Sequence, residues 1–316
     1  MIRTFYLEND NLVFADDISA AARAWNEKRP LWLDADGPHL SFLSEVCGFH
    51  PLAIEECERE TPVPKVENFG TYLFAELHLL LCVGDRLEIY ELDIFLGKDF
   101  LVTYARREIP GFLLLFANQE NITKRLSSPS RLLRGILNQA VFQNLWDLLE
   151  DMDDRMDAIE EQLSGWNLSQ SVLRRITATS GVLGRIKKTL IFHQRVLEEL
   201  VDEAHDLVPG EDMPYLFDLV DKHYRILSET DYLQQRGETL YQLFVDSKDY
   251  QSNEIMKVLT VVATITLPAL LIASIYGMNF KHMPELEQWW GYPSVIGLML
   301  LVGILIFIYM KRRKWL

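Results

Sequence analysis

Cysteine is scarce in this sequence of 316 residues, which contains only Cys47, Cys57 and Cys82. The three show neither a Cys-x-x-Cys pair nor zinc-finger spacing, which argues against a disulfide scaffold and a structural zinc site. We therefore expect free thiols, most of them buried. Enzyme motifs are also missing: the seven His residues form no His-x-x-x-His or Glu-x-x-His cluster, and no Gly-x-Ser-x-Gly or phosphate-binding loop occurs. The sequence gives no support to an enzyme.

Charge is absent from two long stretches near the C-terminus. No charged residue occurs from Val258 to Phe280 or from Gln288 to Met310, and each stretch is 23 residues long. A helix of that length reaches roughly 34 Å, enough to cross a hydrocarbon core of about 30 Å. Hydrophobic residues make up only 49% of the chain. We therefore expect two membrane spans attached to a large soluble body.

The soluble body has far fewer basic than acidic residues. Residues 1–254 carry 25 Lys and Arg against 44 Asp and Glu, whereas the remainder carries six against two. A body with this negative charge repels nucleic acid and attracts cations. Solubility alone would explain the excess of acidic residues equally well. The N-terminus lacks an apolar signal-peptide segment, and basic residues lie before the first span and after the second. We therefore expect both termini in the cytoplasm.

The segment that joins the two spans contains a distinctive set of motifs. It begins with Tyr-Gly-Met-Asn-Phe at 276–280 and continues with Met-Pro-Glu-Leu at 283–286 and Gly-Tyr-Pro at 291–293; a basic cluster follows at 311–314. In this order and spacing the motifs resemble those of the CorA family of magnesium channels. The resemblance implies an α+β fold class with an N-terminal α/β cytoplasmic domain, a long helical stalk, two C-terminal transmembrane helices, and assembly as a funnel-shaped homopentamer.

Changes in residue pattern predict where these parts lie. Strand signals occur near residues 4–7, 12–14, 31–34, 71–81, 87–96 and 100–104, and helices are expected at about 39–47, 51–60 and 110–126. After Pro129, apolar residues recur at helical spacing and predict three long helices, the third unbroken from about Pro214 into the first span. The expected divisions are the α/β domain at 1–128, the bundle and stalk at 129–254, a first transmembrane helix at 255–280, an external loop at 281–291, a second transmembrane helix at 292–310 and a basic cytoplasmic tail at 311–316.

The resemblance implies that the first span lines the pore. Two helices cannot enclose an aqueous path, and neither span holds an ionisable residue suited to a carrier site, so several copies must surround an axis. Steps at helical intervals give the stripe Asn253, Met256, Thr260, Ala263, Leu267, Leu270 and Ser274. Its apolar members can gate the pore by excluding water. Leu270 departs from the Thr that the family often has there.

The resemblance also implies site residues. Gly277, Met278 and Asn279 form the selectivity filter of the family, and a ring of Asn279 carbonyls would hydrogen-bond to the water shell that Mg²⁺ releases reluctantly. His50-Pro51-Leu52 precedes the acidic pair Glu55 and Glu56, and Asp218 lies in the stalk segment 214–218. The family binds regulatory Mg²⁺ between subunits at such positions, commonly with Glu-Asp in place of Glu-Glu. Simple solvation of a surface Glu pair is the alternative.

The sequence, together with the resemblance, predicts passive, membrane-potential-driven influx of hydrated Mg²⁺, with Co²⁺ and Ni²⁺ as further candidates. The resemblance implies that the pore is a pentamer closed by intracellular Mg²⁺. Mg²⁺ is both cargo and regulator, and the expected partners are further copies of the chain, membrane lipid and divalent cations, without nucleic acid. The expected location is the inner membrane of a prokaryote. Two alternatives remain open: a ZntB-like zinc transporter, which the Met-Pro-Glu-Leu segment disfavours, and a membrane-anchored cation sensor that conducts nothing.

Overall fold

The structure is a computed structural model that describes residues 2–9, 11–59, 63–83, 86–109, 112, 122–123, 125–165, 168–278 and 283–313. The chain divides into two compact units. The first comprises residues 1–162 and 170–240, and the second comprises residues 163–169 and 241–316.

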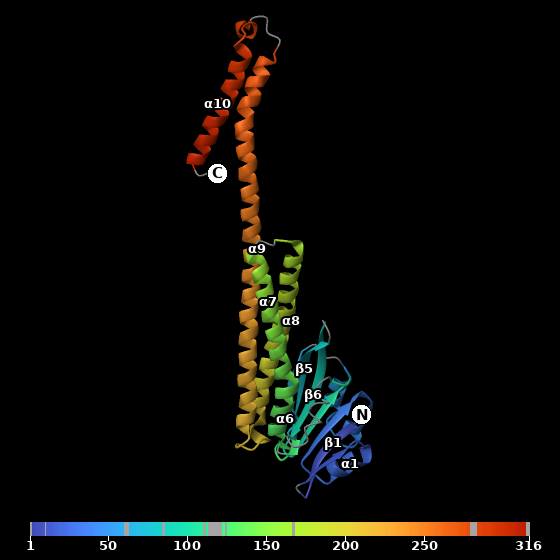
Figure 1. Ribbon diagram of the computed structural model, residues 1–316. Coiled ribbons are helices and arrows are strands. Elements are labelled where there is room, and N and C mark those ends of the chain that lie inside the picture. Colours follow the sequence, from blue (N-terminus) through green and yellow to red (C-terminus); the bar gives the residue numbers. More distant parts are fainter. Residues whose placement is uncertain are drawn as a thin grey trace. The chain divides into compact units, whose positions relative to one another are not determined.

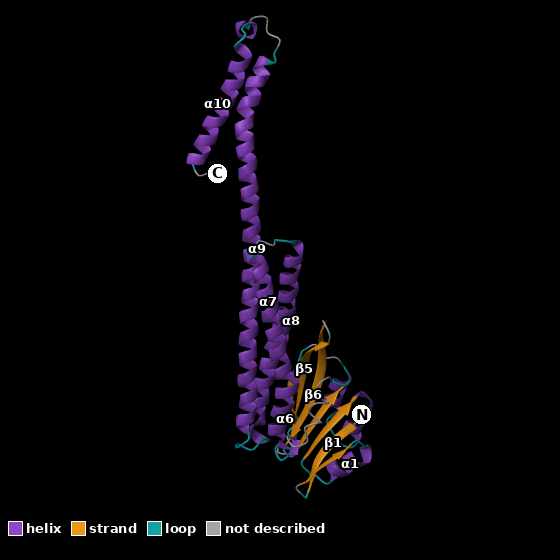
Figure 2. Cartoon of the chain, in the orientation of Figure 1, coloured by secondary structure: helices purple, strands orange, loops and turns teal. Residues whose placement is uncertain are grey.

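The first unit contains a seven-stranded sheet with strand order β2-β1-β3-β7-β6-β5-β4 (Figure 2). Only β3 and β7 pair in parallel, and the other neighbours are antiparallel. The strands are β1 (Ile2–Glu8), β2 (Asn11–Ala15), β3 (Leu31–Asp36), β4 (Val66–Asn68), β5 (Tyr72–Val83), β6 (Arg86–Gly97) and β7 (Phe100–Ala105).

Three short helices cover one face of the sheet: α1 (Ile18–Asn26), α2 (Leu40–Glu45) and α3 (Pro51–Glu58), with a 3-10 turn, η1 (Gly37–His39), before α2. Their apolar residues share one buried cluster with strand residues. Phe49 lies at its centre, because its ring stacks on Phe95 with centroids 4.1 Å apart and lies edge-on to Trp25 at 5.5 Å. Burial of this apolar and aromatic area stabilises the packing of the three helices on the sheet.

The described residues of the first unit also include the helices α6 (Pro129–Leu137), α7 (Gln143–Ser164), α8 (Gln170–Glu203) and the part of α9 up to Leu240 (Figure 1). A π-helical stretch, η2 (Asn138–Phe142), connects α6 to α7, and a 3-10 turn, η3 (Ala204–Asp206), follows α8. Gly237 permits close approach of α9 to α8, because a Cβ there would lie 2.7 Å from Ser180 Oγ. Arg236 forms ion pairs with Asp153, Asp157 and Glu160 of α7.

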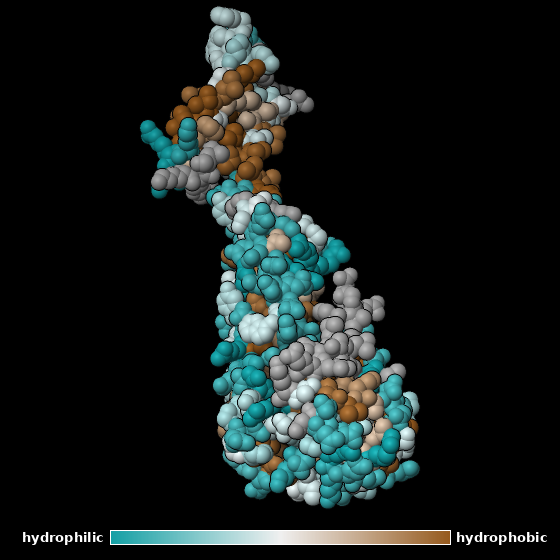
Figure 3. Space-filling model, turned by 60° about the horizontal axis from the view of Figure 1, so that its bottom comes forward, coloured by the Kyte–Doolittle hydropathy of each residue, from teal (hydrophilic) through white to brown (hydrophobic). Residues whose placement is uncertain are grey.

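The second unit contains the remainder of α9 (Met213–Tyr276), a 3-10 turn, η4 (Pro284–Glu287), and α10 (Gly291–Arg312). Both α9 and α10 contain an 18-residue stretch that is long and apolar enough to cross a membrane, with mean hydropathy 2.3 and 2.4 and only 6% of it buried. Figure 3 shows the resulting concentration of apolar surface on these two helices. Such an exposed surface is stable in lipid or against other protein chains.

Most of the expected elements are confirmed, including the first hairpin, the three long helices and the continuity of α9 as one helix of 64 residues. Two expected helices are shorter than their ranges, because α2 ends at Glu45 and α3 at Glu58. Helix α1 and strand β4 were not expected from the sequence. The helix expected at 110–126 lies mostly outside the described residues.

Candidate ion pathway and regulatory residues

The stripe of expected pore-lining residues lies on an exposed face of α9. Its seven members, Asn253, Met256, Thr260, Ala263, Leu267, Leu270 and Ser274, are all exposed in the single chain. The less exposed positions of the same stretch lie on the opposite side of the helix: Glu254, Val261, Ile265, Pro268, Ala269 and Ile272. A Cβ on Gly303 of α10 would contact Ile265 at 3.7 Å, which places this second row on the α10 side. The stripe therefore faces away from α10.

The threonine hydroxyls in this stretch of α9 donate hydrogen bonds to backbone carbonyls of the same helix. Thr260 donates to the carbonyl of Met256 at 2.8 Å, and Thr264 donates to the carbonyl of Thr260 at 2.7 Å. Each hydroxyl oxygen keeps lone pairs that can accept hydrogen bonds from water. Pro268 lies inside the helix and has no N–H to donate to the carbonyl of Thr264. The helix is therefore weakened over the turn that contains the expected gate residue Leu267.

The expected selectivity filter begins where α9 ends. Tyr276 is the last helical residue, and the N–H of Gly277 donates to the carbonyl of Ala273 at 3.0 Å. A Cβ at Gly277 would lie 3.3 Å from that same oxygen, so the glycine permits a close approach to the last helical turn. Met278 is 48% exposed. Asn279, the residue expected to carry selectivity, lies outside the described residues.

The acidic pair follows a well-defined helix start. His50 caps α3 by accepting a hydrogen bond from the N–H of Leu52 at 3.2 Å, and Pro51 occupies the first helical position, where its missing N–H costs nothing. The exposed Glu55 pairs with Arg59 at 2.9 Å, and the half-buried Glu56 pairs with Lys65 at 2.9 Å. Both carboxylates thus have a cationic neighbour within the chain.

The third expected regulatory residue, Asp218, also has cationic neighbours. Arg134 Nε donates to its carboxylate at 2.6 Å, and Lys222 Nζ lies 3.1 Å away. Partial burial raises the pKa of Asp218, but the hydrogen bonds from Arg134 and Lys222 outweigh it and leave the pKa below its ordinary value. In the described part of a single chain, Asp218 forms no three-residue metal cluster with the acidic pair at 55–56.

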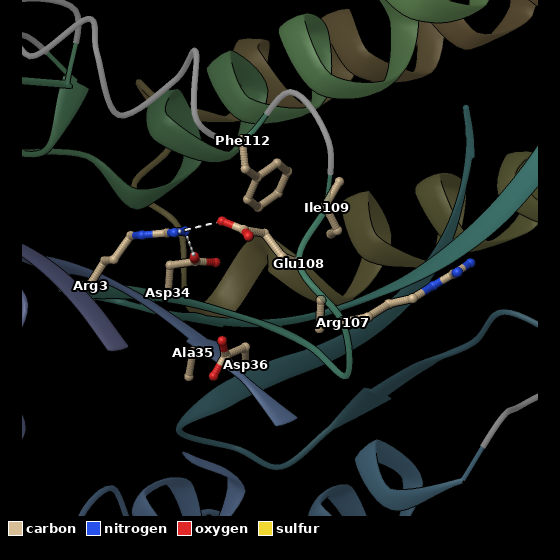
Figure 4. A pocket seen from close by; sticks show the side chains of 9 residues that line it. Arg3, Asp34, Ala35, Asp36, Arg107, Glu108, Ile109 and Phe112 are labelled. Carbon is tan, nitrogen blue, oxygen red and sulfur yellow. Dashed lines mark hydrogen bonds and ion pairs between the residues drawn. The ribbon is translucent and has the colours of Figure 1, made fainter. Parts of the chain in front are cut away.

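A small pocket lies at the end of β3 (Figure 4). Arg3 reaches Asp34 at 3.5 Å and Glu108 at 2.7 Å, and Thr103 donates to Asp34 at 2.7 Å. Burial raises the pKa of Asp34 to about 7, although the hydrogen bond from Thr103 and the charge of Arg3 oppose the shift. These contacts account for the burial of Asp34 without a ligand, so the pocket does not bear on an ion pathway.

Comparison with known proteins identifies the family. Residues 27–312 match the family model described as "CorA-like Mg2+ transporter protein". The chain belongs to this family. The CorA match extends from the end of α1 to the end of α10 and so includes both candidate spans.

A curated CorA relative is the "Cobalt/magnesium transport protein CorA" of Thermotoga maritima, which is 28% identical over 95% of this chain and 87% of its own length. The structure of the CorA magnesium transporter from Methanocaldococcus jannaschii shares the fold, with a TM-score of 0.85 and 21% identity over 100% of this chain and 99% of that one. The ZntB cytoplasmic domain from Vibrio parahaemolyticus is more distant, with a TM-score of 0.50 and 11% identity over 79% of this chain and 96% of that one. The expected fold of the single chain and its CorA membership are therefore confirmed.

Proposed function

We propose that this chain forms a homopentameric pore for passive influx of hydrated Mg²⁺, with spans at 255–280 and 292–310 in the inner membrane of a prokaryote and both termini in the cytoplasm. The observation that carries the proposal is the stripe from Asn253 to Ser274, which is exposed in one chain and faces away from α10. Copies arranged around an axis would bring five such stripes together and enclose a path that one chain cannot form.

In this proposal the pore selects Mg²⁺ with its water shell in place. The stripe has polar residues toward its ends and apolar residues between them, without a charged side chain from 258 onward. Removing the shell of Mg²⁺ would be costly, because the ion holds its octahedral water tightly. A ring of Asn279 amides would instead accept hydrogen bonds from that shell, so the ion could both enter and leave.

The membrane potential supplies the driving force. It contributes about 2.3 kcal/mol per charge per 100 mV, and therefore roughly 4.6 kcal/mol for a divalent cation. No energy-coupling domain is required by this account. Met256, Leu267 and Leu270 would close the path by excluding water when the stripes approach one another, since all three are large and apolar and more than half exposed in the single chain.

Closure would follow binding of intracellular Mg²⁺ by Glu55, Glu56 and Asp218 of neighbouring subunits. The ion shifts the balance only by its difference in affinity for the closed and open forms, and a change from 1:99 to 99:1 requires about 5.5 kcal/mol. Mg²⁺ would have to compete with Arg134 and Lys222 for the Asp218 carboxylate. This competition keeps each site weak, which suits a cell in which free Mg²⁺ is abundant, and several sites around the ring would act together.

The filter assignment can be tested by uptake into liposomes that contain the purified full-length protein and a fluorescent Mg²⁺ indicator. Asn279→Ala should abolish uptake while leaving the oligomer intact on size-exclusion chromatography, because the amide ring would be lost. Gln288→Ala is the matched control, since Gln288 is an exposed amide in the same segment between the spans, and it should keep wild-type uptake. Uptake near the wild-type rate in Asn279→Ala would remove the assignment.

The same preparation distinguishes the alternatives. A ZntB-like transporter would take up Zn²⁺ in preference to Mg²⁺, and a non-conducting sensor would take up neither. Uptake of Co²⁺ and Ni²⁺ in competition with Mg²⁺ would give the ion ranking, because ions with similar hydrated size should share the path.

A further inference from the structure

Three carboxylates and one imidazole gather on a single face of the sheet, outside the pathway described above. In the pairing of β5 with β6, Glu76 lies opposite Asp93 and His78 lies opposite Glu91. Alternate residues of a strand share a face, so all four side chains are on the same side. It is the side that α3 covers, because the thiol of Cys57 in α3 hydrogen-bonds to Asp93.

Two of these carboxylates are buried without enough hydrogen-bond partners. Glu76 is 0% exposed, and neither of its carboxylate oxygens has a hydrogen-bond partner among the described residues. Asp93 is 1% exposed, and its Oδ1 is likewise without a partner in the described part of the chain. Burial, together with repulsion from Glu91 and Glu76, raises the pKa of Asp93 well above its ordinary value. A buried charge that is not compensated is costly, so this cluster needs a cation or protons.

The ligand atoms already lie at distances suited to one metal ion. One donor atom from each of Glu76, His78 and Glu91 falls within 4.8 Å of the others. His78 Nε2 is 3.4 Å from Glu76 Oε1 and 3.9 Å from Glu91 Oε2. Bonds of about 2.1 Å in tetrahedral or octahedral geometry separate neighbouring ligand atoms by about 3.0–3.5 Å. Only a small closure of the three side chains would therefore bring all three to bonding distance of one ion, and water would fill the remaining positions.

Neighbouring residues hold two of the ligands in place. Arg106 Nη2 donates to Glu91 Oε1 at 2.9 Å, which leaves Oε2 as the oxygen nearer His78. The backbone N–H of His78 donates to Nε2 of the buried His193 in α8 at 3.0 Å. This N–H is available because β4 pairs with β5 only as far as Ala75. Such contacts around the ligands orient them and strengthen a metal site.

We propose that Glu76, His78 and Glu91 form a divalent-cation site in the first unit, separate from the pore stripe and from Glu55, Glu56 and Asp218. The imidazole ligand favours a transition-metal ion of the Zn²⁺, Co²⁺ or Ni²⁺ class over Mg²⁺, which prefers oxygen ligands alone. Two carboxylates neutralise the dication. An ion can enter from the side of His78 and Glu91, whose side chains are 13% and 9% exposed, whereas Glu76 closes the inner end of the site.

Bound metal would join β5 to β6 and replace the repulsion between their carboxylates with attraction. It should therefore stabilise the folded first unit in proportion to the ion concentration above its dissociation constant. The site is independent of the proposed transport mechanism, because none of its ligands belongs to the spans.

The test is equilibrium dialysis of Zn²⁺ against the full-length protein in detergent, with a large excess of Mg²⁺ to occupy oxygen-ligand sites. We expect one Zn²⁺ per chain that Mg²⁺ does not displace, and a Zn²⁺-dependent rise in the thermal unfolding midpoint. Loss of even an outer-shell partner costs about 10- to 100-fold in metal affinity, so Glu76→Gln and His78→Gln should each weaken binding by about tenfold or more. His205→Gln and Glu45→Gln alter exposed residues elsewhere and should leave binding unchanged.

Three results would overturn the proposal. The first is a wild-type protein that binds no Zn²⁺ in excess Mg²⁺, and the second is unchanged Zn²⁺ affinity in both ligand variants. The third is a Glu76→Gln protein that is more stable than wild type while its Zn²⁺ binding is the same, which would mean that Glu76 is held protonated. If Glu76→Gln does not fold, His78→Gln and Glu91→Gln, which alter partly exposed positions, give the same comparison.

Discussion

Lowering the pH should destabilise the first unit through His193. This side chain is 2% exposed, and its Nε2 accepts the backbone N–H of His78, which requires the neutral ring. Burial lowers the pKa of His193 to about 3, and nearby His223 and His78 add to the shift. In the unfolded chain the pKa is near 6.5. As the pH falls, the unfolded state therefore binds a proton before the folded state does. The contribution of His193 to the free energy of unfolding is fully present above pH 6.5 and decreases as the pH falls from 6.5 towards 3.

The size of the effect follows from linkage. A pH of about 5 is roughly 1.5 units below the pKa of this histidine in the unfolded chain. Protonation then stabilises the unfolded state by about 2 kcal/mol, whereas the folded state stays unprotonated. For a unit of this size, that loss lowers the unfolding midpoint by about 4–8 °C. Gln can accept the same hydrogen bond and has no charge at any pH. The difference in midpoint between wild type and His193→Gln should therefore change by this amount between about pH 8 and pH 5.

Thermal unfolding of the full-length protein in detergent, followed by tryptophan fluorescence, gives the two midpoints at each pH. Other titrating groups, including Asp34, occur in both proteins and cancel in the difference. His205→Gln, at an exposed position, should differ from wild type by a nearly constant amount. A difference between wild type and His193→Gln that stays constant with pH would refute the reasoning, because it would mean that His193 is protonated or solvated in the folded state.

Three further predictions concern the helices. Arg236→Met should lower stability by about 1 kcal/mol in thermal unfolding, because it removes the cation shared by three largely exposed carboxylates of α7; Arg236→Lys should recover part of the loss. Leu267→Asn should raise Mg²⁺ leak through the closed state, and an unchanged leak would place the gate elsewhere. Asp218→Lys should reduce the effect of Mg²⁺ on protease protection and flux, whereas Arg134→Gln should make Mg²⁺ effective at lower concentration; Mg²⁺ dependence like that of wild type in both would exclude Asp218 as a ligand.

Elements with strong local signals were predictable from the sequence. The long helices follow from repeated apolar spacing after Pro129, and the two uncharged stretches predicted candidate spans that the structure also shows. Helix α1 was missed although Asp17 is a good N-cap, whose carboxylate accepts from the N–H of Ala20 at 2.7 Å. Its run of Ala residues has little apolar contrast, so periodicity gives a weak signal there. Strand β4 has only three residues and offers no period to detect.

Contacts between distant segments could not be read from the sequence. Arg134 and Asp218 are 84 residues apart, and only the packing of α6 beside α9 makes them an ion pair. The pairing of Glu76 with Asp93 depends on the register of β5 and β6, and a shift of one residue would place the two on opposite faces. Motif position located the expected regulatory residues, but it did not show that Glu56 pairs with Lys65 or that Asp218 pairs with Arg134.

The central claim is that the chain conducts Mg²⁺ down its electrochemical gradient. The most direct measurement is Mg²⁺ uptake into liposomes that contain the full-length protein, with a K⁺ diffusion potential set to several values, negative inside, and no nucleotide present. The account predicts uptake that increases with the potential, is unaffected by a proton gradient and falls when Mg²⁺ is added on the side of the soluble body. Uptake that requires a proton gradient and ignores the potential, or no Mg²⁺ uptake at any potential, would contradict it.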